Sequence, residues 1–184
     1  QDVTSDSIPN DTGLLVTTRL DQSTRDYLES GGRVFLLEPE PAFRVEKTNF
    51  RLSSWDGGGP SGTLLNQDHP ALRNMSADGW CDLQFYSLIQ GSKTVSLDEL
   101  PAKVRPLVRC IDRPTRLANR AYLFEVAVGR GKLLVSGFNF ARGITAGDAG
   151  AIYFFDQLLR YALGSDFTPK ASIPVEALTA NVSK

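Results

Sequence analysis

The sequence predicts an α/β fold, and three observations carry this prediction. Residues 14–37 contain a short apolar run, a helical segment and a second apolar run, in that order. Residues 122–136 have the pattern of a β-hairpin, with every second side chain from 122 to 128 on one face and a Gly-Arg-Gly turn, and residues 147–164 repeat apolar side chains at helical spacing. Strands and helices that follow one another in this way are typical of a sheet covered by helices.

Residues 14–37 predict one crossover unit. Leu14–Thr18 is apolar and β-branched, as in a buried strand. Asp21 can cap a helix of about ten residues, because its carboxylate can accept the free amide hydrogens of the first turn. The glycine pair at 31–32 ends that helix, and Arg33–Leu37 forms the second strand. Two strands joined in this way run parallel with a right-handed crossover.

Residues 38–103 form a long loop region in this prediction. The stretch is dense in proline, glycine and serine. Only Thr63–Leu65 and Leu83–Ile89 have the pattern of a short strand or a helical turn. A stretch this long without regular elements is unusual in a compact domain, so we expect functional loops or a contact surface there.

The next segments predict a strand and a hairpin. Val104–Asp112 is the strand, and the hairpin turns at Gly129–Gly131 and returns along Lys132–Ser136. The apolar run at its centre suits a strand covered on both faces. Glu125 should lie opposite the apolar face, solvated or in a salt bridge. That apolar face should contain Tyr122, Phe124, Val126 and Val128.

The clearest helix in the sequence lies near the end, with Asp148 as its cap and Gly164 as its stop. Its predicted apolar stripe consists of Ile152, Phe155, Leu159 and Ala162, widened by Phe154, Leu158 and Tyr161. The chain then divides into a disordered or linking segment at 1–12, a domain at 13–165 and an extended tail at 166–184.

Charge excludes two classes of partner. The chain has 20 basic and 21 acidic residues, a net charge of -1, and its basic residues are scattered. This distribution is untypical of nucleic-acid binding and provides no polybasic patch for a membrane. No apolar run approaches the ~20 residues that span a bilayer. We therefore expect neither nucleic acid nor a membrane as a partner.

Residues 69–86 combine the chain's single histidine with a cysteine and a tryptophan. Asp82 follows Cys81 directly, and a neighbouring carboxylate raises a thiol pKa, which disfavours a nucleophile. Cys110 lies in an apolar run, so both cysteines are predicted to be structural. His69 precedes a proline in a turn without an evident partner. One histidine and two distant cysteines do not make a zinc site, so no metal and no cofactor are expected.

Two tryptophans suggest a different kind of site. Trp55 and Trp80 each stand beside an aspartate, Asp56 and Asp82 respectively, and could form an aromatic platform of the kind that sugar binders use. The alternative is that one or both rings fill the gap between the loops and the sheet. The glycine-rich stretch at 55–62 lacks the Gly-Lys-Ser/Thr ending of a phosphate loop.

Several phrases together resemble a known family. The order SGGRVFLLEP, NQDHPAL, GWCDLQFY, PLVRCID, AYLFEVAVGRGKLLVSGFNF and SDFTPK resembles the C-terminal region of large bacterial glycoside hydrolases of family 2, the β-galactosidase-like group. The resemblance covers about residues 13–170. It implies a fold similar to class I glutamine amidotransferases: a flavodoxin-like three-layer sandwich with a mostly parallel sheet, a C-terminal β-hairpin and a long loop region.

The resemblance also implies a function. The family's catalytic glutamates lie in a TIM barrel of about 250 residues, which this chain cannot contain. The amidotransferase nucleophile has no counterpart here. We therefore expect a non-catalytic accessory domain of a periplasmic or secreted glycoside hydrolase, in contact with its other domains or a second subunit. The alternatives are a carbohydrate-binding module and an amidotransferase-like enzyme using Cys81 or His69. The candidate binding residues are Trp55, Asp56, His69, Trp80 and Asp82, and none is assigned as catalytic.

Overall fold

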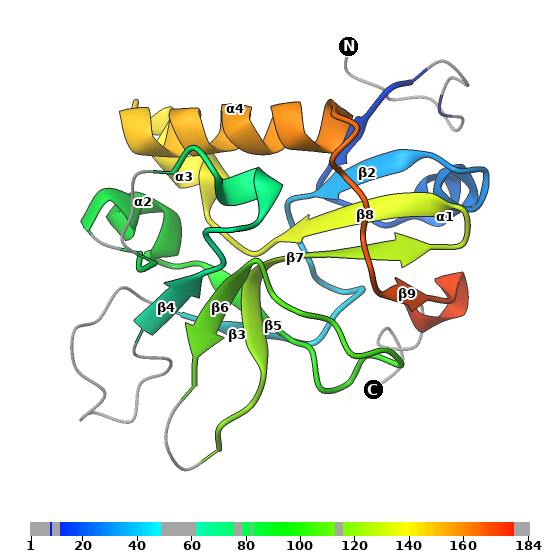
Figure 1. The fold of residues 1–184 in the computed structure, drawn as a ribbon, viewed down its shortest axis with the longest axis horizontal. Coiled ribbons are helices and arrows are strands. Elements are labelled where there is room, and N and C mark those ends of the chain that lie inside the picture. The colour runs from blue at the N-terminus through cyan, green and yellow to red at the C-terminus, as the bar shows by residue number, and fades with distance from the viewer. Residues whose placement is uncertain are drawn as a thin grey trace.

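The computed structural model describes residues 8, 12–48, 62–75, 79–81, 83–112 and 116–178. Within these residues nine strands form a single sheet (Figure 1). The longest strand, β7 (Arg120–Val128), is its centre. Along one edge β7 pairs with β8 (Gly131–Ser136) and β5 (Lys93–Ser96), and along the other with β6 (Val108–Ile111) and β9 (Ser172–Ile173).

The strand directions overturn the predicted fold class. Strands β1 (Leu15–Thr17), β2 (Arg33–Leu36) and β8 are parallel, as are β7 and β9. The other pairs are antiparallel, and they include β3 (Val45–Lys47) with β5 and β4 (Gly62–Leu65) with β6. The flavodoxin-like sandwich with a mostly parallel sheet is therefore wrong. Parallel neighbours need long crossovers, usually helical, and the described part of the chain between β3 and β7 has only short helical turns.

The predicted crossover unit at the start of the domain is confirmed. Helix α1 (Gln22–Glu29) connects β1 to β2, which run parallel. The Asp21 carboxylate accepts the Thr24 amide hydrogen with an N–O distance of 2.9 Å. Gly31 follows the helix with φ +106°, a conformation that glycine adopts without steric cost.

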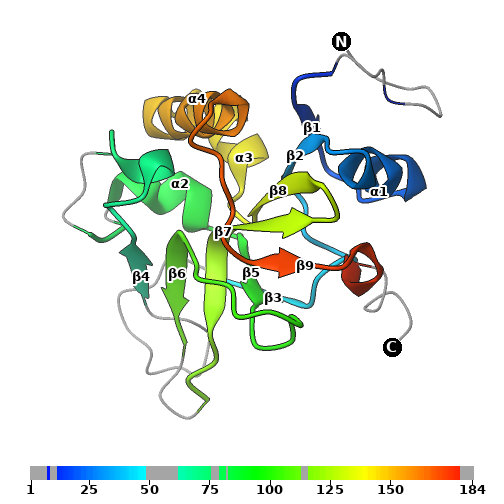
Figure 2. The ribbon, with the colours of Figure 1, turned by 45° about the vertical axis from the view of Figure 1, so that its right-hand side comes forward.

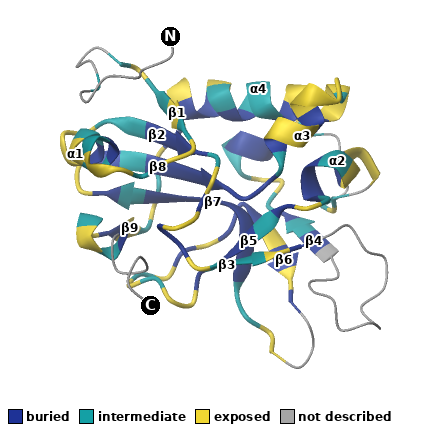
Figure 3. Ribbon diagram, turned by 180° about the vertical axis from the view of Figure 1, so that it is seen from behind, coloured by how far each residue is buried: buried dark blue, intermediate teal, exposed yellow. Residues whose placement is uncertain are grey.

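The sheet is buried on both faces, because its inner strands alternate between two apolar clusters. In β2, Phe35 packs in one cluster and Val34 and Leu36 in the other. Helices α3 (Phe140–Thr145) and α4 (Ala149–Leu163) cover the first face, and α1 lies against the other, as Figure 2 shows. The predicted central strand is confirmed, since β8 lies between β2 and β7 and its core is fully buried (Figure 3).

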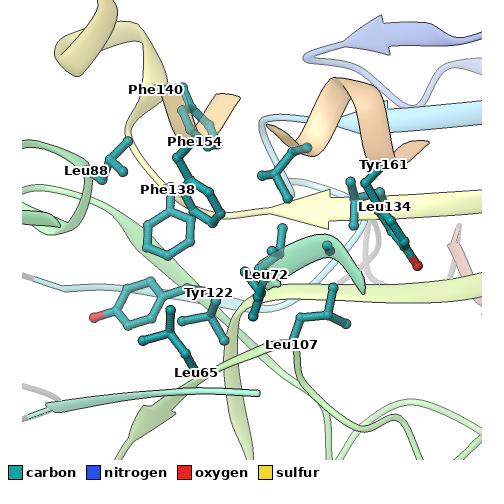
Figure 4. Packing of buried hydrophobic residues seen from close by; sticks show 14 of the residues in the cluster. Leu65, Leu72, Leu88, Leu107, Tyr122, Leu134, Phe138, Phe140, Phe154 and Tyr161 are labelled. Atoms are coloured by element: carbon teal, nitrogen blue, oxygen red, sulfur yellow. The ribbon is translucent and has the colours of Figure 1, made fainter. Parts of the chain in front are cut away.

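A β-bulge in β7 corrects the predicted apolar face of the hairpin. Arg109 pairs with Ala121 and Val108 with Leu123, so Tyr122 is an extra residue. Its ring joins the cluster under α4 and stacks on Phe138, with centroids 5.2 Å apart (Figure 4). The three other residues of the predicted face lie in the opposite cluster. Tyr122 therefore does not share a face with Phe124, Val126 and Val128.

Helix α4 confirms both predicted ends and the predicted stripe except for one residue. The Asp148 carboxylate accepts the Ala151 amide hydrogen at 3.0 Å, and Gly164 is the C-terminal cap. Ile152, a member of the predicted stripe, is 46% exposed. Phe154, Leu158, Tyr161 and Ala162 are buried as predicted, together with Ala151, and Phe155 and Leu159 are half-buried against the same cluster. The buried face is centred on Phe154 and Leu158, because the helix packs against β2 and the turns at Pro70–Leu72 and Leu83–Phe85.

The region predicted as a long loop contains more structure than expected. Its two predicted elements are confirmed as β4 and as the turn η2 (Leu83–Phe85) with helix α2 (Tyr86–Ile89). Strands β3 and β5 and the 3₁₀ turn η1 (Pro70–Leu72) were not predicted. Beyond α4, β9 and the turn η3 (Val175–Leu178) return the chain to the sheet.

Candidate functional site

A buried cluster joins three distant parts of the chain: His69, Glu125 and Tyr161. The Tyr161 hydroxyl donates a hydrogen bond to Glu125 Oε2 at 2.5 Å. His69 Nε2 lies 3.5 Å from Glu125 Oε1, a long polar contact. The two rings meet edge to face with centroids 5.4 Å apart. Each carboxylate oxygen thus has a polar neighbour, which the burial of a charged group requires.

His69 is held in place by the turn that it begins. It is the N-terminal cap of η1, and its Nδ1 accepts the Ala71 amide hydrogen at 3.3 Å. A nitrogen that accepts a hydrogen bond carries no proton, so the ring proton lies on Nε2, which faces Glu125. The sequence revealed no partner for His69, and the structure supplies one in Glu125.

Tyr161 reaches the cluster from α4. Figure 4 shows its ring beside Leu134, with the hydroxyl directed away from the other labelled rings. Burial raises the pKa of Tyr161 well above its ordinary value, and the hydrogen bond to Glu125 raises the pKa further. The phenol therefore remains a donor, which fixes one oxygen of the carboxylate.

Glu125 is expected from the sequence to be solvated or salt-bridged, but it is only 8% exposed. The prediction that Glu125 is solvated is wrong, because α4 covers the face of β7 from which this side chain extends. The exposed part of Glu125 lines a pocket of about 530 Å³. Its walls come from three segments: residues 66–70 after β4, residues 103–107 before β6, and residues 166–171 before β9.

Charged side chains of both signs line this pocket: Lys103, Arg105 and Lys170, with Asp68 and Asp166. These five side chains are exposed, and none forms an ion pair or a side-chain hydrogen bond with another residue that the structure describes. With Glu125 included, three cationic and three acidic side chains line the pocket, so the charges balance when His69 is neutral. Unpaired groups of both signs can bind a ligand that both donates and accepts hydrogen bonds.

The edge of β7 is interrupted at this pocket. The Leu123 carbonyl accepts the Leu107 amide hydrogen at 2.9 Å, and the Ala127 amide donates to the Ala171 carbonyl at 2.8 Å. Peptide groups of alternate residues in a strand point to the same edge. The N–H and C=O of Glu125 therefore point between Leu107 and Ala171, and no described residue is hydrogen-bonded to them there.

The other candidate residues lie elsewhere. Trp80 is 57% exposed and pairs through its backbone with Leu64, at the free edge of β4. Neither Trp80 nor Cys81 lines the pocket at Glu125. The structure therefore separates His69 from the tryptophan and cysteine that follow it in sequence. Trp55, Asp56 and Asp82 lie outside the described residues.

Both cysteines are free and unsuited to nucleophilic chemistry. Burial raises the pKa of the Cys81 thiol to about 12, although a hydrogen bond with Thr63 opposes this shift. Burial raises the pKa of Cys110 to about 12 as well. Thr63 pairs with Cys110 across β4 and β6, and its hydroxyl accepts the Cys81 amide hydrogen from the other side. Two strand spacings, about 9.5 Å, separate the cysteines, which is too far for a disulfide.

Two further pockets contain acidic side chains that are already paired with arginines. One of about 580 Å³ adjoins the Glu125 pocket behind Pro70, and its Arg160 and Asp156 already pair at 2.7 Å. Another, of about 830 Å³, lies between residues 97–104 and 117–119. Its Asp112 is engaged by Arg116 at 2.5 Å.

A protein-family model matches residues 15–183, and it is described as a domain of unknown function (DUF8487). The chain belongs to this family. No curated protein matches the sequence.

Two further findings concern the described part of the molecule. It contains no group of three or more histidine, cysteine, aspartate or glutamate side chains arranged to hold a metal ion. None of its helices is long and apolar enough to cross a membrane. In this member of the DUF8487 family the buried polar cluster of His69, Glu125 and Tyr161 adjoins a pocket of about 530 Å³.

Proposed function

We propose that this chain is a non-catalytic accessory domain of a glycoside hydrolase and that it binds carbohydrate in the pocket at Glu125. One observation carries the proposal: a buried carboxylate, held by Tyr161 and His69, lines a pocket whose other charged side chains, of both signs, have no ion-pair partner among the described residues. The resemblance of the sequence to β-galactosidase-like enzymes supports the same class of ligand.

Carbohydrate suits this lining because each hydroxyl group donates one hydrogen bond and accepts others. Asp68 and Asp166 can accept from hydroxyls, and Lys103, Arg105 and Lys170 can donate to them. The balance of charge favours a neutral ligand over a strongly charged one. A volume of about 530 Å³ is sufficient for a saccharide, since small-molecule pockets span about 300–1,000 Å³.

The non-catalytic part of the proposal is supported by the occupied donors and acceptors of the cluster. Both nitrogens of His69 have partners, and so do both oxygens of Glu125. His69 Nδ1 accepts from the Ala71 amide and so has no free lone pair to act as a general base, whereas the Glu125 oxygens keep lone pairs with which they can accept from a ligand. Neither cysteine offers a thiolate near neutral pH.

The test is calorimetric titration of the chain with neutral monosaccharides and oligosaccharides, together with a Glu125→Gln variant. Because hydrogen bonds to a charged group contribute about 1.5–3 kcal/mol, this change should weaken binding by about 10- to 100-fold. Glu38→Gln is the matched control, because Glu38 is half exposed and pairs with Lys93 away from the pocket.

A second variant guards against misfolding of Glu125→Gln. Replacing Asp68 and Asp166 by asparagine alters two exposed side chains and should also weaken binding. Absence of heat with every saccharide tested would refute the proposed binding role. Hydrolysis of aryl glycosides by the isolated chain would refute its non-catalytic character.

A further inference from the structure

We infer that the pocket selects a saccharide bearing an N-acetylamino group, and that the unpaired peptide group of Glu125, between β6 and β9, recognises this group. The inference rests on the proposed carbohydrate-binding function and specifies its ligand. Its basis is the gap in backbone pairing along β7, where the peptide group of Glu125 lies between the partners of Leu123 and Ala127.

The amide hydrogen of Glu125 needs an acceptor. A buried peptide N–H without a partner costs free energy comparable to a lost hydrogen bond. The flanking positions of the same edge are satisfied by Leu107 and Ala171, whereas the peptide group of Glu125 has no hydrogen-bond partner there among the described residues. The carbonyl oxygen of an N-acetyl group is a strong acceptor, and it extends beyond the sugar ring far enough to enter a narrow gap.

The surroundings of the gap suit the rest of such a group. Leu107 is buried, Ala171 is half-buried, and both line the pocket on either side of Glu125. The apolar side chain of Leu107 can contact the methyl of an acetyl group, whereas the Ala171 side chain packs against the cluster on the opposite face of the sheet. The carbonyl of Glu125 can accept a hydrogen bond from the hydroxyl next to the acetylamino group on the ring.

An added peptide strand does not fit the same gap. Strand addition needs a row of free peptide groups along a sheet edge. Here β6 occupies the edge at Leu123 and β9 occupies it at Ala127, which leaves a single residue between them. A compact group is therefore favoured over an extended chain.

The experiment compares N-acetylglucosamine and N-acetylgalactosamine with glucose and galactose, by calorimetry and by ¹H–¹⁵N NMR of the whole chain. One additional buried hydrogen bond should make the N-acetylated sugars bind up to about tenfold more tightly. Hydrogen exchange of the Glu125 amide should slow when they bind. Equal affinity for the plain hexoses, with no change at that amide, would overturn the inference and leave the proposed function intact. Failure of all four sugars to bind would count against both.

Discussion

Glu125 is a charged side chain in the middle of the longest strand, and its surroundings explain why it can be buried. Tyr161 donates to one oxygen and His69 lies beside the other, so the carboxylate exchanges water for protein partners. The sequence identified Glu125 as an acidic residue opposite an apolar face. It could not indicate the partners, because these come from a turn after β4 and from the last helix.

Reactivity of the two cysteines follows from their burial. Because burial raises both thiol pKa values from an ordinary value of 9.0 to about 12, we expect negligible alkylation by iodoacetamide at pH 8 in the folded chain. Both thiols should react quickly in denaturant. Rapid labelling of Cys81 without denaturant would contradict the structure and revive a nucleophilic role.

The same shifts predict a pH dependence of stability. The folded state keeps both thiols protonated up to a pH of about 12, whereas the unfolded chain loses these protons near pH 9. The folded state thus binds more protons in this interval, and its free energy of unfolding falls as pH rises. Chemical unfolding between pH 8 and 11 should show this decline. A variant with both cysteines replaced by alanine should show less of it.

Among the elements, those specified by short local patterns could be predicted. The caps at Asp21 and Asp148 depend on a side chain and an amide three residues away, so the sequence predicts both. Strands β3 and β5 have three and four residues, which is too short for a clear alternation. The bulge at Tyr122 has no local signal, since it arises from the register between β6 and β7.

One unpredicted contact stabilises the end of α4. Arg33, on β2, donates through Nη1 to three carbonyls at that end: Ala162 at 3.2 Å, Leu163 at 2.6 Å and Gly164 at 3.1 Å. These acceptors have no partner within the helix, and a cation there also interacts favourably with the helix dipole.

We expect Arg33→Met to lower the free energy of unfolding by about 1–2 kcal/mol, measured by urea denaturation. Arg33→Lys should lose less, because the charge remains. Arg73→Met is the matched control: Arg73 is exposed, and no described residue forms an ion pair with it. A loss in Arg33→Met no larger than in this control would show that the helix end is satisfied by solvent.

At the scale of the whole molecule, the directions of most strands could not be predicted from the sequence. The crossover from β1 to β2 was predicted because its helix is local. The antiparallel pairs of β3 with β5 and of β4 with β6 join residues 46 and 43 positions apart, counted from Lys47 to Lys93 and from Leu65 to Val108. The resemblance supplied a parallel sheet in their place, and the structure corrects it.

The site was likewise only partly predicted from the sequence: His69 was selected, but Tyr161 was assigned to the core alone.

The segment after α4 is integral to the domain, and Phe167 tests this. Its side chain is fully buried beside Tyr161, with ring centroids 5.3 Å apart, and its carbonyl accepts from Lys132 Nζ at 2.6 Å. Phe167→Ala should destabilise the chain by about 3–5 kcal/mol in thermal or chemical unfolding. Lys170→Ala, at an exposed position nearby, should change stability by less than about 0.5 kcal/mol. Similar stability of the two variants would show that this segment docks only weakly.

Strand β7 pairs with four other strands: β5 and β6, which precede it in the sequence, and β8 and β9, which follow it. During synthesis on the ribosome, the chain up to Asn119 emerges without this strand. Strands β5 and β6 then lack their shared neighbour, and their apolar side chains stay accessible to chaperones and to other nascent chains. The sheet is complete only after Ile173 has left the exit tunnel, because β9 also pairs with β7.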